Sequence, residues 1–96
     1  MIVKVHKTAD RTILAICDEN LLNKKFEEGG LQLDLTSDFY KGREKPEQEI
    51  FELIKKAGII NAVGEKCIRF LLKNKMISKE NIIKIKDIPH VQVVFC

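Results

Sequence analysis

The 96-residue sequence predicts a single α+β domain over residues 1–96. We expect a mostly antiparallel sheet of about five strands, in the order β-β-β-α-α-β-β, with two consecutive helices packed on one face. Alternating apolar residues near both ends of the chain are typical of strands, and two stretches with helical spacing lie between them. Strands grouped around consecutive helices favour this class over a wound parallel sheet.

The first two elements are strands over residues 1–7 and 12–17, joined by the short polar turn 8–11. The first strand alternates apolar and polar side chains, which indicates one buried face. The second is apolar on both faces and is therefore predicted to be a central strand. Together they form the most clearly predicted hairpin of the chain.

Asp18 follows directly and can cap a single helical turn over residues 19–22. A short extended piece is predicted at 24–26. The segment Glu27–Gly30 is a turn, because its two glycines can take positive φ. Alternating leucines then predict a strand over residues 31–36, followed by a loop.

Pro46 suits the first turn of a helix, whose apolar residues continue to Ala57. Gly58 is a break. A second, more buried helix is predicted from Ile59 through Leu72, and Lys66, Arg69 and Lys73 share its remaining polar face.

The chain closes with two strands. Residues 81–86 alternate, with Lys84 and Lys86 predicted to face outward. Residues 87–90 form a tight connection, and residues 91–95 form the last strand.

Composition excludes several classes of protein. No apolar run approaches the roughly 20 residues that span a bilayer, and no signal peptide precedes the first strand. Cys17, Cys67 and Cys96 lack the spacing of a zinc site or a disulfide scaffold, so we expect reduced, structural cysteines and a cytoplasmic location. The composition, rich in Lys, Glu and Ile, is also typical of thermophilic proteins.

Two short segments carry polar residues that the predicted fold does not require. Asp18 and Glu19 could act as a base or metal ligand, although a cap on the helical turn is the favoured interpretation. Asn61 and Gly64 are poor residues for a helix interior. They indicate close packing, which is favoured, or a ligand lying against the helix.

A third polar segment contains His90 and Gln92, which share a strand face two residues apart. They could present an imidazole and an amide to a phosphate, a base or a carbonyl. A turn formed by Pro89 and followed by a solvated histidine explains the same residues.

A basic sheet face would form if the two end strands were neighbours, and it would contain Lys4, His6, Lys84, Lys86 and Gln92. Such a face could bind an RNA backbone. The alternative is a solvated face whose charges discourage edge-to-edge aggregation. The net charge is only +3, and Lys outnumbers Arg 14 to 3, which argues against base-specific recognition.

Four motifs resemble those of an uncharacterised family of short archaeal proteins, a domain of unknown function: Cys17-Asp18-Glu19-x-Leu21, Phe39-Tyr40-x-Gly42, Asn61-x-Val63-Gly64-Glu65 and Pro89-His90-x-Gln92. The resemblance spans essentially the whole chain, with Asn23 where the family's pattern has Gly. It implies a single-domain cytoplasmic protein associated with translation or RNA metabolism. It implies no activity and no catalytic residue.

The favoured hypothesis is a non-catalytic binding module for RNA or a ribonucleoprotein. It predicts no catalytic residue, cofactor, metal or membrane contact, and its candidate binding residues are Asp18, Glu19, Asn61, Gly64, Lys84, Lys86, His90 and Gln92. One alternative is a small enzyme in which His90 is a general base oriented by Asp18 or Glu19. Another is a protein-interaction subunit, either monomeric or homodimeric.

Overall fold

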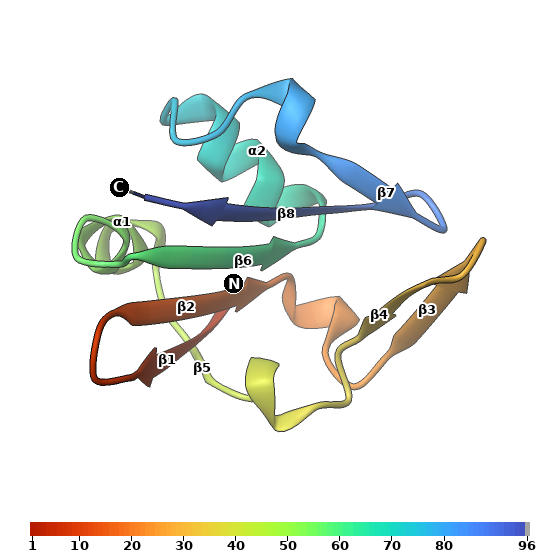
Figure 1. Cartoon of the computed structure of the whole chain (residues 1–96), viewed down its shortest axis with the longest axis horizontal. Coiled ribbons are helices and arrows are strands. Elements are labelled where there is room, and N and C mark those ends of the chain that lie inside the picture. The colour runs from red at the N-terminus through yellow and green to blue at the C-terminus, as the bar shows by residue number, and fades with distance from the viewer. Residues whose placement is uncertain (96) are drawn as a thin grey trace.

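The computed structural model describes residues 1–95 and has an α+β fold with a six-stranded sheet in the order β5–β1–β2–β6–β8–β7 (Figure 1). Neighbouring strands are antiparallel except β2 and β6, which are parallel. The predicted class and its mostly antiparallel sheet are confirmed. The elements are β1 (Ile2–Lys7), β2 (Thr12–Cys17), β3 (Lys25–Glu28), β4 (Leu31–Asp34), β5 (Arg43–Glu44), α1 (Glu47–Ile54), β6 (Ile59–Val63), α2 (Glu65–Lys73), β7 (Ile83–Ile85) and β8 (Ile88–Val94).

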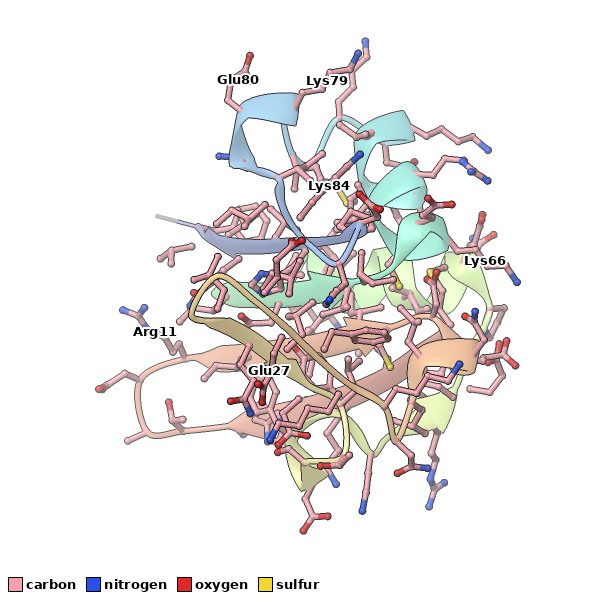
Figure 2. The ribbon with its side chains drawn as sticks, turned by 90° about the vertical axis from the view of Figure 1, so that its right-hand side faces the viewer. Arg11, Glu27, Lys66, Lys79, Glu80 and Lys84 are labelled. Carbon is pink, nitrogen blue, oxygen red and sulfur yellow. The ribbon has the colours of Figure 1, made fainter. Side chains whose placement is uncertain are left out.

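The six-stranded sheet is covered differently on its two faces. Both helices pack on one face, as predicted, and bury a core that includes Leu14, Ile60 and Leu71. The separate β3–β4 hairpin crosses part of the other face, where Leu33 and Leu35 pack on the sheet (Figures 1 and 2). We call these the helix face and the hairpin face. The strand predicted over residues 31–36 therefore belongs to a second sheet rather than to the main one.

The central position predicted for the second strand is confirmed. Residues 14–17 of β2 are fully buried, because they contact the helix-face core and the hairpin-face core in alternation. The antiparallel β1–β2 hairpin has the predicted bounds within one residue. A short 3₁₀ turn at Glu19–Leu21 follows, and Asn23 takes the left-handed conformation, with φ of 70°.

The main error of the sequence prediction concerns residues 59–63, which form β6 rather than the start of a helix. Because β6 lies between β2 and β8, its side chains apart from Asn61 are apolar on both faces, and such a short segment shows no alternation typical of a strand. Helix α2 begins only after Gly64. Asn61 is thus a strand residue, which removes the cost in helix propensity that had made it conspicuous.

The end of the chain also differs from the prediction. Strand β8 begins at Ile88, so Pro89 and His90 lie within the strand rather than in the connection. The β7–β8 turn is formed by Lys86 and Asp87, both with positive φ. Strand β5, which was not predicted, extends the sheet at the outer edge of β1. Within residues 1–95, neither helix is long and apolar enough to cross a bilayer.

Asp18 is the buried acid that joins the sheet to α2. Its backbone N–H donates to the carbonyl of Val63, and its carboxylate accepts hydrogen bonds from the backbone N–H groups of Lys66 and Cys67 at 3.0 and 2.9 Å. These donors are in the first turn of α2, where helical N–H groups have no partner within the helix. Asp18 therefore caps a helix 48 residues further along the chain, not the turn that follows it.

Gly64 makes this cap possible. Its φ is +112°, and a Cβ at this position would lie 2.3 Å from the Asp18 Cγ. Any side chain would therefore collide with the carboxylate and strain the backbone. The structure thus supports the packing interpretation of Gly64, whereas the predicted cap by Asp18 on residues 19–22 is wrong.

Cys17 and Cys67 are buried close to this cap. Burial, with a smaller contribution from the Asp18 carboxylate, raises the pKa of Cys17 to about 11 and raises that of Cys67 further. Both thiols stay protonated near neutral pH, which agrees with a structural role.

Replacement of Asp18 by Ala is expected to reduce the free energy of unfolding by about 2 kcal/mol or more, because two charge-assisted hydrogen bonds are lost and two N–H groups are left without partners. Gly64→Ala should cost about as much through steric overlap and positive φ. Urea denaturation followed by circular dichroism measures both effects. Glu19→Ala, an exposed neighbour, is the control and should change stability by less than about 0.5 kcal/mol.

Candidate functional site

The eight candidate binding residues do not form one surface. Asp18 and Gly64 lie at the beginning of α2, on the helix face, and are occupied by the cap. Glu19 is exposed beside the amino group of Met1, at 3.5 Å. The other five lie in β6, β7, β8 and the β7–β8 turn, and three of them share a face.

Asn61, His90 and Gln92 are the three that share a face. Asn61 is paired with Ala15 on one side and with Gln92 on the other, and His90 is paired with Val63. Ala15 and Val63 pack in the hairpin-face core, so all three polar side chains lie on that face. Gln92 is exposed, whereas Asn61 and His90 are half-buried.

The basic sheet face predicted from Lys4, His6, Lys84, Lys86 and Gln92 does not form. Strands β1 and β7 are separated by β2, β6 and β8, so the two end strands are not neighbours. Lys84 is paired with Pro89, next to His90 in β8, and therefore lies on the helix face, opposite to Gln92. Lys86 is in the β7–β8 turn, where its backbone N–H donates to the Glu28 carboxylate of the hairpin at 3.0 Å.

His6 is also not a free surface histidine. Its Nε2 is 2.9 Å from the carbonyl oxygen of Phe39, and its ring stacks on that of Phe39 with the centroids 4.6 Å apart. The side chain is thus held against the loop that follows the hairpin and is not available as part of a basic face.

The enzyme alternative required an acid within hydrogen-bond reach of His90. The Asp18 carboxylate bonds to α2 on the helix face, whereas His90 lies on the hairpin face. Burial lowers the pKa of His90, so the imidazole is neutral near pH 7. The pairing of a general base with Asp18 is therefore wrong. Among residues 1–95, no three His, Cys, Asp or Glu side chains gather as metal ligands.

Basic residues also gather elsewhere, around two hollows at the β5 edge. The first, of about 370 Å³, is bounded by α2, Pro46 and Glu44. The second, of about 310 Å³, lies between β1 and the segment 41–45, and Lys45 lines both. We call their basic lining the basic surface, which consists of Lys4, Lys41, Arg43, Lys45, Lys66, Arg69 and Lys73.

Four acids line the hollows or pair with the basic surface, and one of them, Asp38, lies 3.5 Å from the Lys41 ammonium. Glu44 and Glu47 line the first hollow, and the Glu44 carboxylate is 3.0 Å from the amino group of Met1. That hydrogen bond is the main cause that lowers the pKa of Glu44, with a small contribution from Lys66. Lys45 pairs with Glu49 at 3.2 Å, but within residues 1–95 Lys66, Arg69 and Lys73 have no carboxylate within 4.0 Å.

Part of the basic surface is visible in the sequence. Lys66, Arg69 and Lys73 have the spacing of one helix face, and Lys41, Arg43 and Lys45 alternate along an edge segment. Their proximity depends on tertiary packing that the sequence pattern does not show. Figure 2 places Lys66 beyond α2 and Lys84 at β7, on separate parts of the surface.

The half-buried His90 predicts a dependence of stability on pH. Because its pKa is lowered in the folded protein, the unfolded chain binds a proton more readily, and stability should fall as the pH drops through about 6.5. We expect the urea midpoint of the wild type to fall between pH 7.5 and 5.5, and His90→Gln to reduce this fall. An equal fall in both proteins would contradict the assignment.

Comparison with known proteins agrees with this fold. Residues 6–95 match the model of a family described as a protein of unknown function, DUF424. The crystal structure of an uncharacterized conserved protein from Methanopyrus kandleri is similar, with a TM-score of 0.80 and 27% identity, over 96% of this chain and 88% of that chain. No curated protein matches the chain. Because the family match covers nearly all the chain, the protein belongs to the DUF424 family.

Proposed function

We propose that the protein is a non-catalytic RNA-binding module and that it holds the RNA backbone on the basic surface. One observation carries this proposal: seven of the 17 Lys and Arg residues line the two adjoining hollows, against two of the 14 acids, with two further acids, Asp38 and Glu49, paired to Lys41 and Lys45. A chain with a net charge of only +3 thus concentrates its positive charge at one edge of the sheet.

The arrangement of these side chains suits a chain of phosphates. Lys66, Arg69 and Lys73 follow one side of α2, and the basic residues of segment 41–45 follow the sheet edge, so the two rows meet at Lys45. Lysine provides a mobile point charge, which suits backbone phosphates better than base edges. Recognition of the backbone, without reading of sequence through the basic surface, is therefore the favoured mode.

A cytoplasmic role in a ribonucleoprotein or translation complex would fit this mode of binding, as the family resemblance implied. The candidate residues Asn61, His90 and Gln92 are on the hairpin face, line neither hollow and take no part in the proposed contact. Lys84 and Lys86, at the opposite edge of the sheet from β5, also take no part.

A protein-contact surface on the hairpin face is a second candidate function. Leu31, Ile83 and Val94 are each more than half exposed on this side of the molecule. If two copies meet on this face, the mass measured by light scattering should rise with concentration, and Ile83→Ser should prevent the rise. A strict monomer at all concentrations would contradict self-association.

RNA binding predicts that the variant K66Q/R69Q/K73Q binds a fluorescein-labelled single-stranded RNA at least about tenfold more weakly at low salt. Three lost phosphate contacts should also make the slope of log affinity against log salt shallower by about 2. Fluorescence anisotropy over a range of KCl concentrations measures both quantities. Absence of binding by the wild type at 50 mM KCl would contradict the proposed function.

The matched control is K79Q/K84Q/K86Q, which removes the same charge from the region around β7 and should bind RNA nearly as well as the wild type. These three lysines are exposed and form no ion pair within residues 1–95. Equal weakening by both variants would show that net charge alone governs the interaction, and would overturn the assignment to the basic surface.

A further inference from the structure

We propose that the uncovered part of the β1 edge binds an extended acidic segment of a partner protein as an additional strand of the sheet. This inference goes beyond the proposed function, which concerns side chains of the basic surface and not the backbone of β1. The carrying observation is that β1 is paired with β2 over all of Ile2–Lys7, whereas β5 covers only Ile2 and Val3 on the other side (Figure 1). Within residues 1–95, the rest of this edge has no neighbouring strand.

The backbone groups of Val5 and Lys7 point away from β2, toward this uncovered edge. In an antiparallel pair, successive residues of a strand direct their N–H and C=O groups to opposite sides. The carbonyl of Met1 accepts a hydrogen bond from the N–H of Lys45 at 3.1 Å, so the odd-numbered residues of β1 bond toward β5 and the even-numbered ones toward β2. Within the described part of the chain, neither the Val5 nor the Lys7 N–H has a backbone partner. The edge therefore presents backbone donors and acceptors to solvent.

The segment before β5 turns away from the edge at Gly42. A Cβ on Gly42 would overlap the carbonyl oxygen of Val3, so the two backbones are as close here as a glycine allows. The N–H of Gly42 donates to the carbonyl of Tyr40 at 2.9 Å rather than to β1. This departure leaves the hollow of about 310 Å³ beside Val5, which gives a ligand access to the backbone of β1.

Cations flank the uncovered edge on both faces of the sheet. Lys4 is paired with Ala15, which belongs to the hairpin-face core, whereas Arg43 is paired with Val3, which belongs to the helix-face core. Lys7 also lies on the helix face, because alternate residues of β1 project to opposite faces. Within residues 1–95, none of these three cations is within 4.0 Å of a carboxylate, and no acid among them lines this hollow.

These charges and backbone groups together determine which partner fits. A second copy of this chain would bring the same basic edge, and like charges on paired strands are unfavourable. Phosphates of an RNA would neutralise the cations, but they only accept hydrogen bonds and would leave the carbonyls of Val5 and Lys7 without partners. An extended segment supplies both donors and acceptors, and its acidic side chains would lie against the flanking cations. An acidic strand is therefore the partner that satisfies both features.

The test measures binding of a fluorescein-labelled octapeptide of alternating Thr and Glu, capped at both ends, by fluorescence anisotropy. The wild type should bind it at least about tenfold more tightly than the same octapeptide with its central amides N-methylated, because methylation removes the backbone donors and keeps the charge. Equal affinity for the two peptides would show attraction by charge alone and would overturn the strand site.

A pair of substitutions at Val5 tests the edge from the side of the protein. Val5→Pro removes the outward N–H and leaves the β1–β2 ladder intact, and proline is tolerated at such edge positions. It should weaken octapeptide binding by about fivefold, whereas Val5→Thr keeps the N–H and the branched shape, and as the matched control it should bind like the wild type. Equal binding by the proline and threonine variants would contradict the proposal.

Amide hydrogen exchange of the wild type keeps the test independent of the stability of the Val5 variants. The Val5 amide should exchange rapidly in the free protein and at least about tenfold more slowly when the octapeptide is saturating, because pairing with a strand protects it. Exchange that the octapeptide does not change would overturn the strand site.

The variant K66Q/R69Q/K73Q separates this inference from the proposed function. Its substitutions lie on α2, so octapeptide binding at physiological salt should stay within about twofold of the wild type while RNA binding is lost. If the wild type binds RNA but not the octapeptide, the strand site is wrong and RNA binding stands. If it binds the octapeptide but not RNA, the proposed function is wrong and the strand site stands.

Discussion

The hydrogen bonds between the Asp18 carboxylate and the first turn of α2 fix the start of this helix against the end of β2. Asp18 comes directly after β2, and its backbone also bonds to Val63 at the end of β6, so a single residue joins three elements. The cap sets where α2 begins and, with it, the direction in which Lys66, Arg69 and Lys73 project. The proposed RNA-binding surface therefore depends on a buried acid that does not itself belong to it.

Sequence reasoning succeeded where the determining interactions are local. The β1–β2 hairpin follows from the alternation of residues 1–7 and the apolar run 12–17, and the glycine turn follows from the need for positive φ at Gly29 and Gly30. The start of α1 follows from Pro46 and the acids after it. The predicted cap by Asp18 on the turn over residues 19–22 was wrong, because Asp18 caps α2, a helix distant in the chain that no local pattern identifies.

The sequence predictions were wrong where secondary structure or the position of a side chain depends on residues distant in the chain. Ile59–Val63 is apolar except for Asn61 because β2 and β8 flank it and cores cover both faces, and a helix of that length would show the same composition. The basic surface draws on β1, segment 41–45 and α2, which meet only through the edge strand β5 and the placement of α2. Lys84 does not join Lys4 and His6 in a basic sheet face for a similar reason. The alternation of residues 81–86 predicts a strand but does not show which strands are its neighbours.

The parallel pairing of β2 with β6 has a consequence for the kinetics of folding. The paired residues Ile13 and Ile59 are 46 positions apart, and the chain between them forms the hairpin, the edge strand β5 and α1. Such a long loop must close before the strands can meet, and non-local pairing of this kind slows folding. We expect the β1–β2 hairpin to form early and the β2–β6 contact to limit the rate. Two apolar strand edges would then be exposed during the slowest folding step. Aggregation between chains is therefore most favourable at that stage.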